Sequence, residues 1–135
     1  MRSSIEPALS EVTGWDVFDA NVRVGHSGIH GELALEAPEL VVEMDRFGIR
    51  RALVSHFTAE EYDAEEGNCA LACDVREHAD RFLPVWAALP DEASVRALAT
   101  RQPRAVRLFF GVAKHNFSWQ PWCSGELFEF LQAHS

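Results

Sequence analysis

Strand-like apolar runs and amphipathic helical segments alternate along almost the whole of this sequence, and no other feature limits the possible folds as strongly. Alternation at this spacing is typical of strand–helix–strand crossovers, which join the parallel strands of one sheet. The sequence therefore predicts an α/β fold with about four strand–helix units. We expect strands at 15–25, 49–57, 81–89 and 104–110, and helices at 38–47, at 68–78, through 95–99 and at 122–133.

Local patterns support several of these boundaries. Pro38 suits the first turn of a helix, and Gly48 suits the position after its last turn. The strand at 49–57 contains a continuous apolar run, as expected for a strand covered on both faces. Pro84 cannot donate a hydrogen bond to a neighbouring strand, so we expect it near a strand's beginning. The acidic segment 57–66 is expected to be solvated.

Length and charge limit the classes of function. A chain of 135 residues normally forms one domain, which we expect at 15–135, after an N-terminal tail at 1–14. The formal net charge of -9 disfavours nucleic acid and anionic membrane surfaces as partners, because both attract clustered Lys and Arg. No apolar run reaches the roughly 18 residues of a membrane-spanning helix.

The cysteines indicate a reducing compartment. There are three of them, an odd number, and no apolar signal segment precedes the domain, so we expect free thiols and a cytoplasmic protein. Cys69 and Cys73 lie four residues apart on a predicted helix. We expect both to be small buried residues packed against the sheet.

The first strand and the loop after it carry an unusual polar pattern. The segment WDVFDANVRVG places Asp19, Asn21 and Arg23 two residues apart, so on a regular strand their side chains would share one face. A polar face in a small and otherwise apolar chain is either exposed to solvent or lines the mouth of a barrel.

Three segments together resemble a known family. DANVRVG, EMDRFGIRRALVSH and EHADRFLPVWAALP resemble the amidohydrolase-related superfamily of TIM-barrel metal-dependent hydrolases, in particular its decarboxylase-like "amidohydrolase 2" branch. In that family the first strand usually ends Asp-x-His-x-His, and the two His ligate a catalytic divalent metal. Here Asn21 and Arg23 occupy those two positions. Arg has no acceptor and a neutral amide is a weak ligand, so no metal is expected at the usual site.

The resemblance covers only the first four units of a barrel, which as a whole needs about 250 residues. It implies a TIM-barrel-like half-barrel whose open edges need a partner. The chain is then a fragment, or another chain supplies the second half, or two copies pair. We favour a homo-oligomer. The family's further metal ligands belong to later strands, so no complete inherited metal site is expected here.

Active sites in this architecture lie at the carboxyl ends of the strands, which selects a small set of candidate residues. Arg23 and Arg107 could hold a carboxylate or phosphate bidentately; alternatively, each pairs with a nearby acid such as Asp19. The candidate ligand-binding residues are Asn21, Arg23, Arg107 and His115.

His26 and His56 are the candidate catalytic residues, since either could act as a general base near neutral pH. Together with His115 they could instead hold a zinc ion; otherwise they are loop histidines bonded to water or backbone. Aromatic residues at and after the end of the fourth predicted strand, among them Phe109 and Trp119, suggest a plug over the barrel bottom, a subunit interface or the apolar wall of a ligand pocket.

Two hypotheses follow. The first is a degenerate or incomplete hydrolase-like domain that binds a small anionic ligand. The alternative is an active metal-dependent hydrolase or decarboxylase whose remaining metal ligands come from another chain or from missing residues. Elemental analysis of the purified protein separates them, because stoichiometric zinc or manganese would favour the enzyme.

Overall fold

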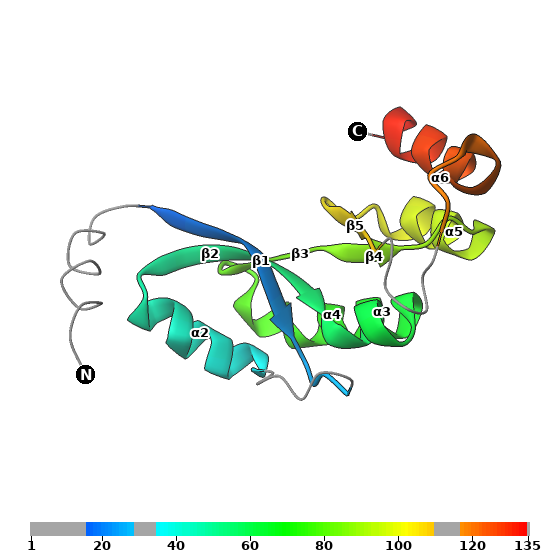
Figure 1. Cartoon of the computed structure of the whole chain (residues 1–135). Coiled ribbons are helices and arrows are strands. Elements are labelled where there is room, and N and C mark those ends of the chain that lie inside the picture. Colours follow the sequence, from blue (N-terminus) through cyan, green and yellow to red (C-terminus); the bar gives the residue numbers. More distant parts are fainter. Residues whose placement is uncertain (1–15, 29–34, 110–116, 135) are drawn as a thin grey trace, which may run out of the picture.

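Parallel strands form two small sheets in the computed structural model, which describes residues 16–28, 35–109 and 117–134. The first sheet has the order β1-β2-β3, and the second pairs β4 with β5 (Figure 1). The predicted α/β class with parallel strands is thereby confirmed. The strands are β1 Val17–Val24, β2 Ile49–His56, β3 Phe82–Pro84, β4 Trp86–Ala88 and β5 Val106–Leu108.

Helices connect the strands that pair within each sheet, as parallel pairing requires. The helices of the described chain are α2 Ala37–Arg46, α3 Phe57–Glu61, α4 Ala64–Asp74, the 3-10 turn η1 Arg76–His78, α5 Glu92–Arg101 and α6 Pro121–Ala133. Helices α2 and α4 cover one face of the first sheet, and α5 and α6 lie beside β4 and β5 (Figure 1). We call the face of the first sheet that α2 and α4 cover the outer face, and the opposite face the inner face.

Helix α2 begins and ends where its sequence predicts. Pro38 stands in the first turn, and Glu36 and Glu39 form a reciprocal capping box in which the Glu36 N–H donates to Glu39 at 3.1 Å. Gly48 follows with a φ of 67°, a left-handed conformation that Gly adopts readily. The helix buries Leu40 and Met44 against the sheet.

The core lies between the first sheet and its two helices. Met44 and Leu71 are almost completely buried, and each such side chain contributes roughly 1.5–3 kcal/mol to stability. A second group joins β4 to α5 and α6 through Ala88, Leu98 and Leu127. The first group consists of Val24, Ala37, Leu40, Met44, Ala52, Val54, Leu71, Val75 and Phe82.

Strand β1 carries a bulge that corrects the prediction of one polar face. Asp19 is the partner of Ala52, whereas Arg23 is the partner of Ser55, and the register shifts between Asp19 and Val22. Partners in a parallel pair point to the same side, and residues three apart on β2 point to opposite sides. Asp19 therefore lies on the outer face and Arg23 on the inner face.

The predicted strand 81–89 divides into β3 and β4, which belong to different sheets. Pro84 is the last residue of β3 and has no N–H for the ladder. The Val85 N–H still donates to Val54 at 2.8 Å, but the Trp86 N–H donates to Ala105 at 3.0 Å. The chain thus exchanges one neighbouring strand for the next immediately after the proline.

The acidic segment 57–66 is solvated only in its second half, where Asp63, Glu65 and Glu66 are exposed, so the prediction is wrong for its first half. Its first half is helix α3, in which Phe57, Ala59 and Glu61 are buried. Helix α4 starts at Ala64, four residues earlier than expected, because Asp63 caps it by accepting from the Glu66 N–H at 2.8 Å.

The predicted burial of Cys69 and Cys73 is also wrong, since both are exposed. The sheet side of α4 is formed instead by Ala64, Gly67, Asn68 and Leu71. A separate finding concerns membranes: no helix in the described part of the chain is long and apolar enough to cross one.

Candidate functional site

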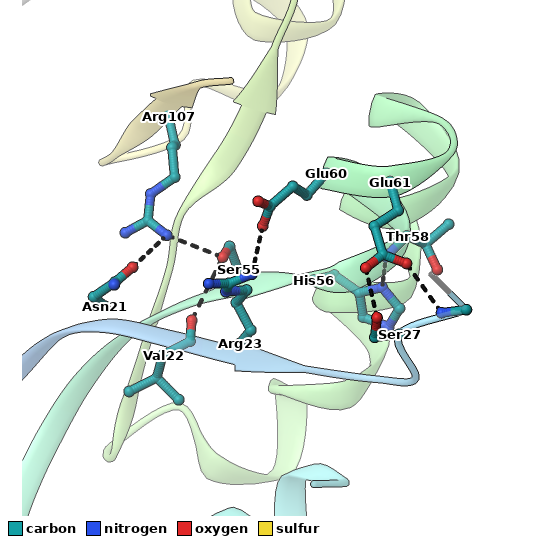
Figure 2. A network of polar contacts seen from close by, with 11 residues as sticks. Asn21, Val22, Arg23, Ser27, Ser55, His56, Thr58, Glu60, Glu61 and Arg107 are labelled. Carbon is teal, nitrogen blue, oxygen red and sulfur yellow. Dashed lines mark hydrogen bonds and ion pairs between the residues drawn. The ribbon is translucent and has the colours of Figure 1, made fainter. Parts of the chain in front are cut away.

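The inner face of the first sheet gathers polar side chains from three strands and one helix (Figure 2). Arg23 and Ser55 are cross-strand partners on β1 and β2, so their side chains share this face. Arg107 reaches the same place from β5, although β5 does not pair with either strand. We call Asn21, Arg23, Ser55, Glu60 and Arg107 the inner-face site.

Arg107 connects β5 to the first two strands. Its Nη1 donates to the Asn21 amide oxygen at 3.1 Å and to Ser55 Oγ at 3.2 Å, and its Nη2 donates to the Ala20 carbonyl at 3.2 Å. Ser55 is 1% exposed and passes its own hydrogen to the Val22 carbonyl at 3.4 Å. Within the described residues these acceptors are all neutral, so the charge of Arg107 is solvated by dipoles rather than balanced by a carboxylate.

Arg23 is paired differently. Its Nη1 lies 3.2 Å from Glu60 Oε2, and its guanidinium carbon lies 5.2 Å from the centre of the Phe57 ring. The expected alternative of a pair with Asp19 is not what the structure has, because the bulge turns Asp19 away and α3 presents Glu60 instead. Asp19 accepts from the backbone N–H of Asn21 at 2.9 Å.

Glu61, the next residue of α3, is a buried carboxylate that the sequence did not single out. It is 3% exposed, and it accepts from Ser27 Oγ at 2.6 Å and from the Gly28 N–H at 3.0 Å. Charge-assisted hydrogen bonds of this kind are short and strong. Glu61 therefore fixes the loop that follows β1, while Glu60 faces Arg23.

Both nitrogens of the His56 ring are engaged inside the protein. Nδ1 accepts from the Thr58 N–H at 3.1 Å, which caps α3, so the neutral ring carries its proton on Nε2. That nitrogen lies 3.4 Å from Asp74 on α4. Burial lowers the pKa of His56 below its ordinary value, against the opposing effects of the Asp74 and Glu36 carboxylates. The geometry gives this residue a structural role, as the junction of β2, α3 and α4.

His26, the other predicted catalytic residue, does not join this group. His26 is exposed and lies 3.1 Å from Glu36, away from the inner-face site. His115 lies outside the described residues. Of the predicted site residues, the structure brings together Asn21, Arg23 and Arg107.

Sequence reasoning missed Ser55, Glu60 and Glu61 as members of this region. Ser55 could have been predicted from the sequence, because it is a polar residue near the carboxyl end of a strand, where a site was expected. The two glutamates gave no such signal, since an acidic run is usually a solvated surface.

No group of three or more His, Cys, Asp or Glu side chains suited to a metal ion occurs among the residues that the structure describes. The zinc hypothesis that combines His26, His56 and His115 involves one residue beyond that part of the chain. No protein-family model matches the sequence, and no curated protein or solved structure is significantly similar to it. The resemblance to amidohydrolase-related proteins therefore stays a hypothesis based on the three quoted segments.

Proposed function

We propose that this chain is a cytoplasmic, amidohydrolase-related half-barrel without the family's metal pair, and that it binds a small carboxylate on its inner face. Arg107 carries the proposal. It is a guanidinium group whose contacts within the described residues are neutral, and it lies among an amide and a hydroxyl. Such a group retains the charge and the donors that a carboxylate needs.

The position of Arg107 supports the same function. Its side chain joins β5 of the second sheet to β1 of the first, and such a link would suit the curved wall of a TIM-barrel half. The two positions of the family's metal pair serve other contacts here. Asn21 accepts from Arg107, and Arg23 binds Glu60.

The test is calorimetric titration of the protein with propionate. We expect saturable binding by the wild type and loss of binding by Arg107→Met, which keeps the aliphatic stem but removes the guanidinium. Arg96→Met is the matched control, because Arg96 pairs with Glu92 on the exposed side of α5. Unchanged propionate affinity in Arg107→Met would contradict the proposal, as would absence of binding by the wild type.

A further inference from the structure

Glu60 makes the two guanidinium groups of the inner-face site different, because it neutralises Arg23 but not Arg107. The Arg23 and Glu60 side chains are only 33% and 19% exposed, and their charged atoms lie 3.2 Å apart. Water competes less effectively for a partly buried pair than for a surface one. The charge of Arg23 is therefore already balanced by Glu60 before a ligand binds, in contrast to that of Arg107.

The bulge in β1 affects the net charge of the inner-face site. It places Asp19 on the outer face, so the Asp19 carboxylate does not count toward the inner-face site. Glu61 is turned to the loop at Ser27 and Gly28. Among the residues that the structure describes, two guanidinium groups and one carboxylate, Glu60, then leave a single positive charge for a ligand to match.

We propose that Glu60 is a specificity-determining residue, which restricts the inner-face site to ligands with one negative charge by neutralising Arg23. The inference rests on the proposed function, because it needs a ligand on Arg107. A second negative charge on the ligand would meet a guanidinium already bound to Glu60 and would lie near that carboxylate. The class of ligand is therefore a monocarboxylate with an uncharged body, and dicarboxylates and phosphate dianions are disfavoured.

The test compares propionate with succinate at about pH 8, where both carboxyl groups of free succinate are ionised. We expect the wild type to prefer propionate. Glu60→Gln keeps the shape of the side chain and frees the charge of Arg23, so the ratio of succinate to propionate affinity should rise on the order of tenfold. The titrations are made at constant ionic strength, because salt screens the effect.

A charge-restoring variant separates specificity from damage to the fold. Glu60→Gln combined with Arg23→Gln again leaves one positive charge on the inner face, and we expect it to prefer propionate as the wild type does. Glu43→Gln is the control, since Glu43 also pairs with an arginine, Arg46, but on the exposed surface of α2 and away from the inner-face site. We expect that control to leave the ratio unchanged.

Distinct results overturn the two proposals. If wild type binds propionate but the affinity ratio does not change in Glu60→Gln, the role of Glu60 is wrong and the proposed function stands. If the wild type binds succinate more tightly than propionate, the role of Glu60 is likewise wrong and the proposed function stands. If wild type binds neither compound, or if Arg107→Met binds as well as wild type, the proposed function itself is wrong.

Discussion

His56 connects three elements through one imidazole ring, and this makes stability depend on its protonation. The ring accepts from the Thr58 N–H and faces Asp74. A proton on Nδ1 removes the acceptor that caps α3. Since α3 carries both Glu60 and Glu61, the cap also supports the contacts of Arg23 and of the loop at Ser27.

We therefore predict that the free energy of unfolding decreases as the pH falls below about 6.5, the ordinary pKa of His. Burial lowers the pKa of His56 in the folded state, so the unfolded chain takes up the proton first and stability rises with pH in this range. Urea unfolding between about pH 5 and pH 8 measures the slope. His56→Asn keeps a capping side chain without this titration and should flatten the curve, whereas His26→Asn at an exposed position should not.

Gly25 allows the chain to pass against the His56 ring. Its φ is 83°, and a Cβ added there would lie 2.4 Å from His56 Nε2. We predict that Gly25→Ala destabilises the fold by about 2–4 kcal/mol, combining the cost of a left-handed Ala with that of an overpacked site. Thermal unfolding provides the measurement.

Gly48 supplies the comparison for that substitution. Its φ is 67°, but nothing lies within 4 Å of an added Cβ. Gly48→Ala should therefore cost only about 1–2 kcal/mol, from the backbone conformation alone. Equal losses in the two variants would show that the contact with the His56 ring has no energetic weight.

At the scale of elements, the Asn68 side chain takes the hydrogen bonds that a neighbouring strand would otherwise make to β4. Its amide donates to the Ala87 carbonyl at 2.8 Å and accepts from the Ala87 N–H at 2.8 Å, and the side chain is buried in α4. Both backbone groups of Ala87 are thus satisfied by one side chain, which fixes α4 against the second sheet.

Asn68→Ala should destabilise the protein by about 2–4 kcal/mol, because it leaves a buried donor and a buried acceptor unpaired. Urea unfolding followed by tryptophan fluorescence gives the value. Thr100→Ala is a suitable control, since its hydroxyl donates to the Arg96 carbonyl on the exposed side of α5. We expect that control to change stability by less than about 0.5 kcal/mol, and a similarly small loss for Asn68→Ala would contradict the role of Asn68.

The alternation of elements could be predicted from the sequence because the periods of strands and helices are local properties. The bounds of α2, β2 and α6 agree with the prediction within two residues. Features that depend on pairing could not be predicted. The division at Pro84 and the bulge after Asp19 both arise from the choice of a neighbouring strand, which the local sequence does not reveal.

The site was predictable to the same extent. Arg23 and Arg107 were expected to converge, because the carboxyl ends of parallel strands meet at one edge. Both lie at Ser55: Arg23 is its cross-strand partner, and Arg107 donates to its hydroxyl. The pairing of Arg23 with Glu60 was missed because the segment after His56 was expected to be solvated. The exposed thiols were missed because α4 buries glycine and asparagine, which give no apolar stripe.

For the whole molecule, we predict association of two copies. Strand β1 lies at an edge of the first described sheet and β5 at an edge of the second, and a strand edge is a template for pairing. Trp119 and Trp122 are 61% and 81% exposed, which leaves large apolar side chains at the surface. Light scattering should give a mass near twice the 15.1 kDa of the chain. A mass of one chain at all concentrations would contradict this expectation.

The exchange of partners at Val85 has a dynamic consequence. A single covalent strand holds hydrogen bonds to β2 and to Ala105, the residue before β5, through the consecutive backbone amides of Val85 and Trp86. Neither half can separate from its neighbour without pulling on the other, so both sheets belong to one cooperative unit. In deuterated water these two amides should exchange at similar rates, in a single opening event that involves both sheets.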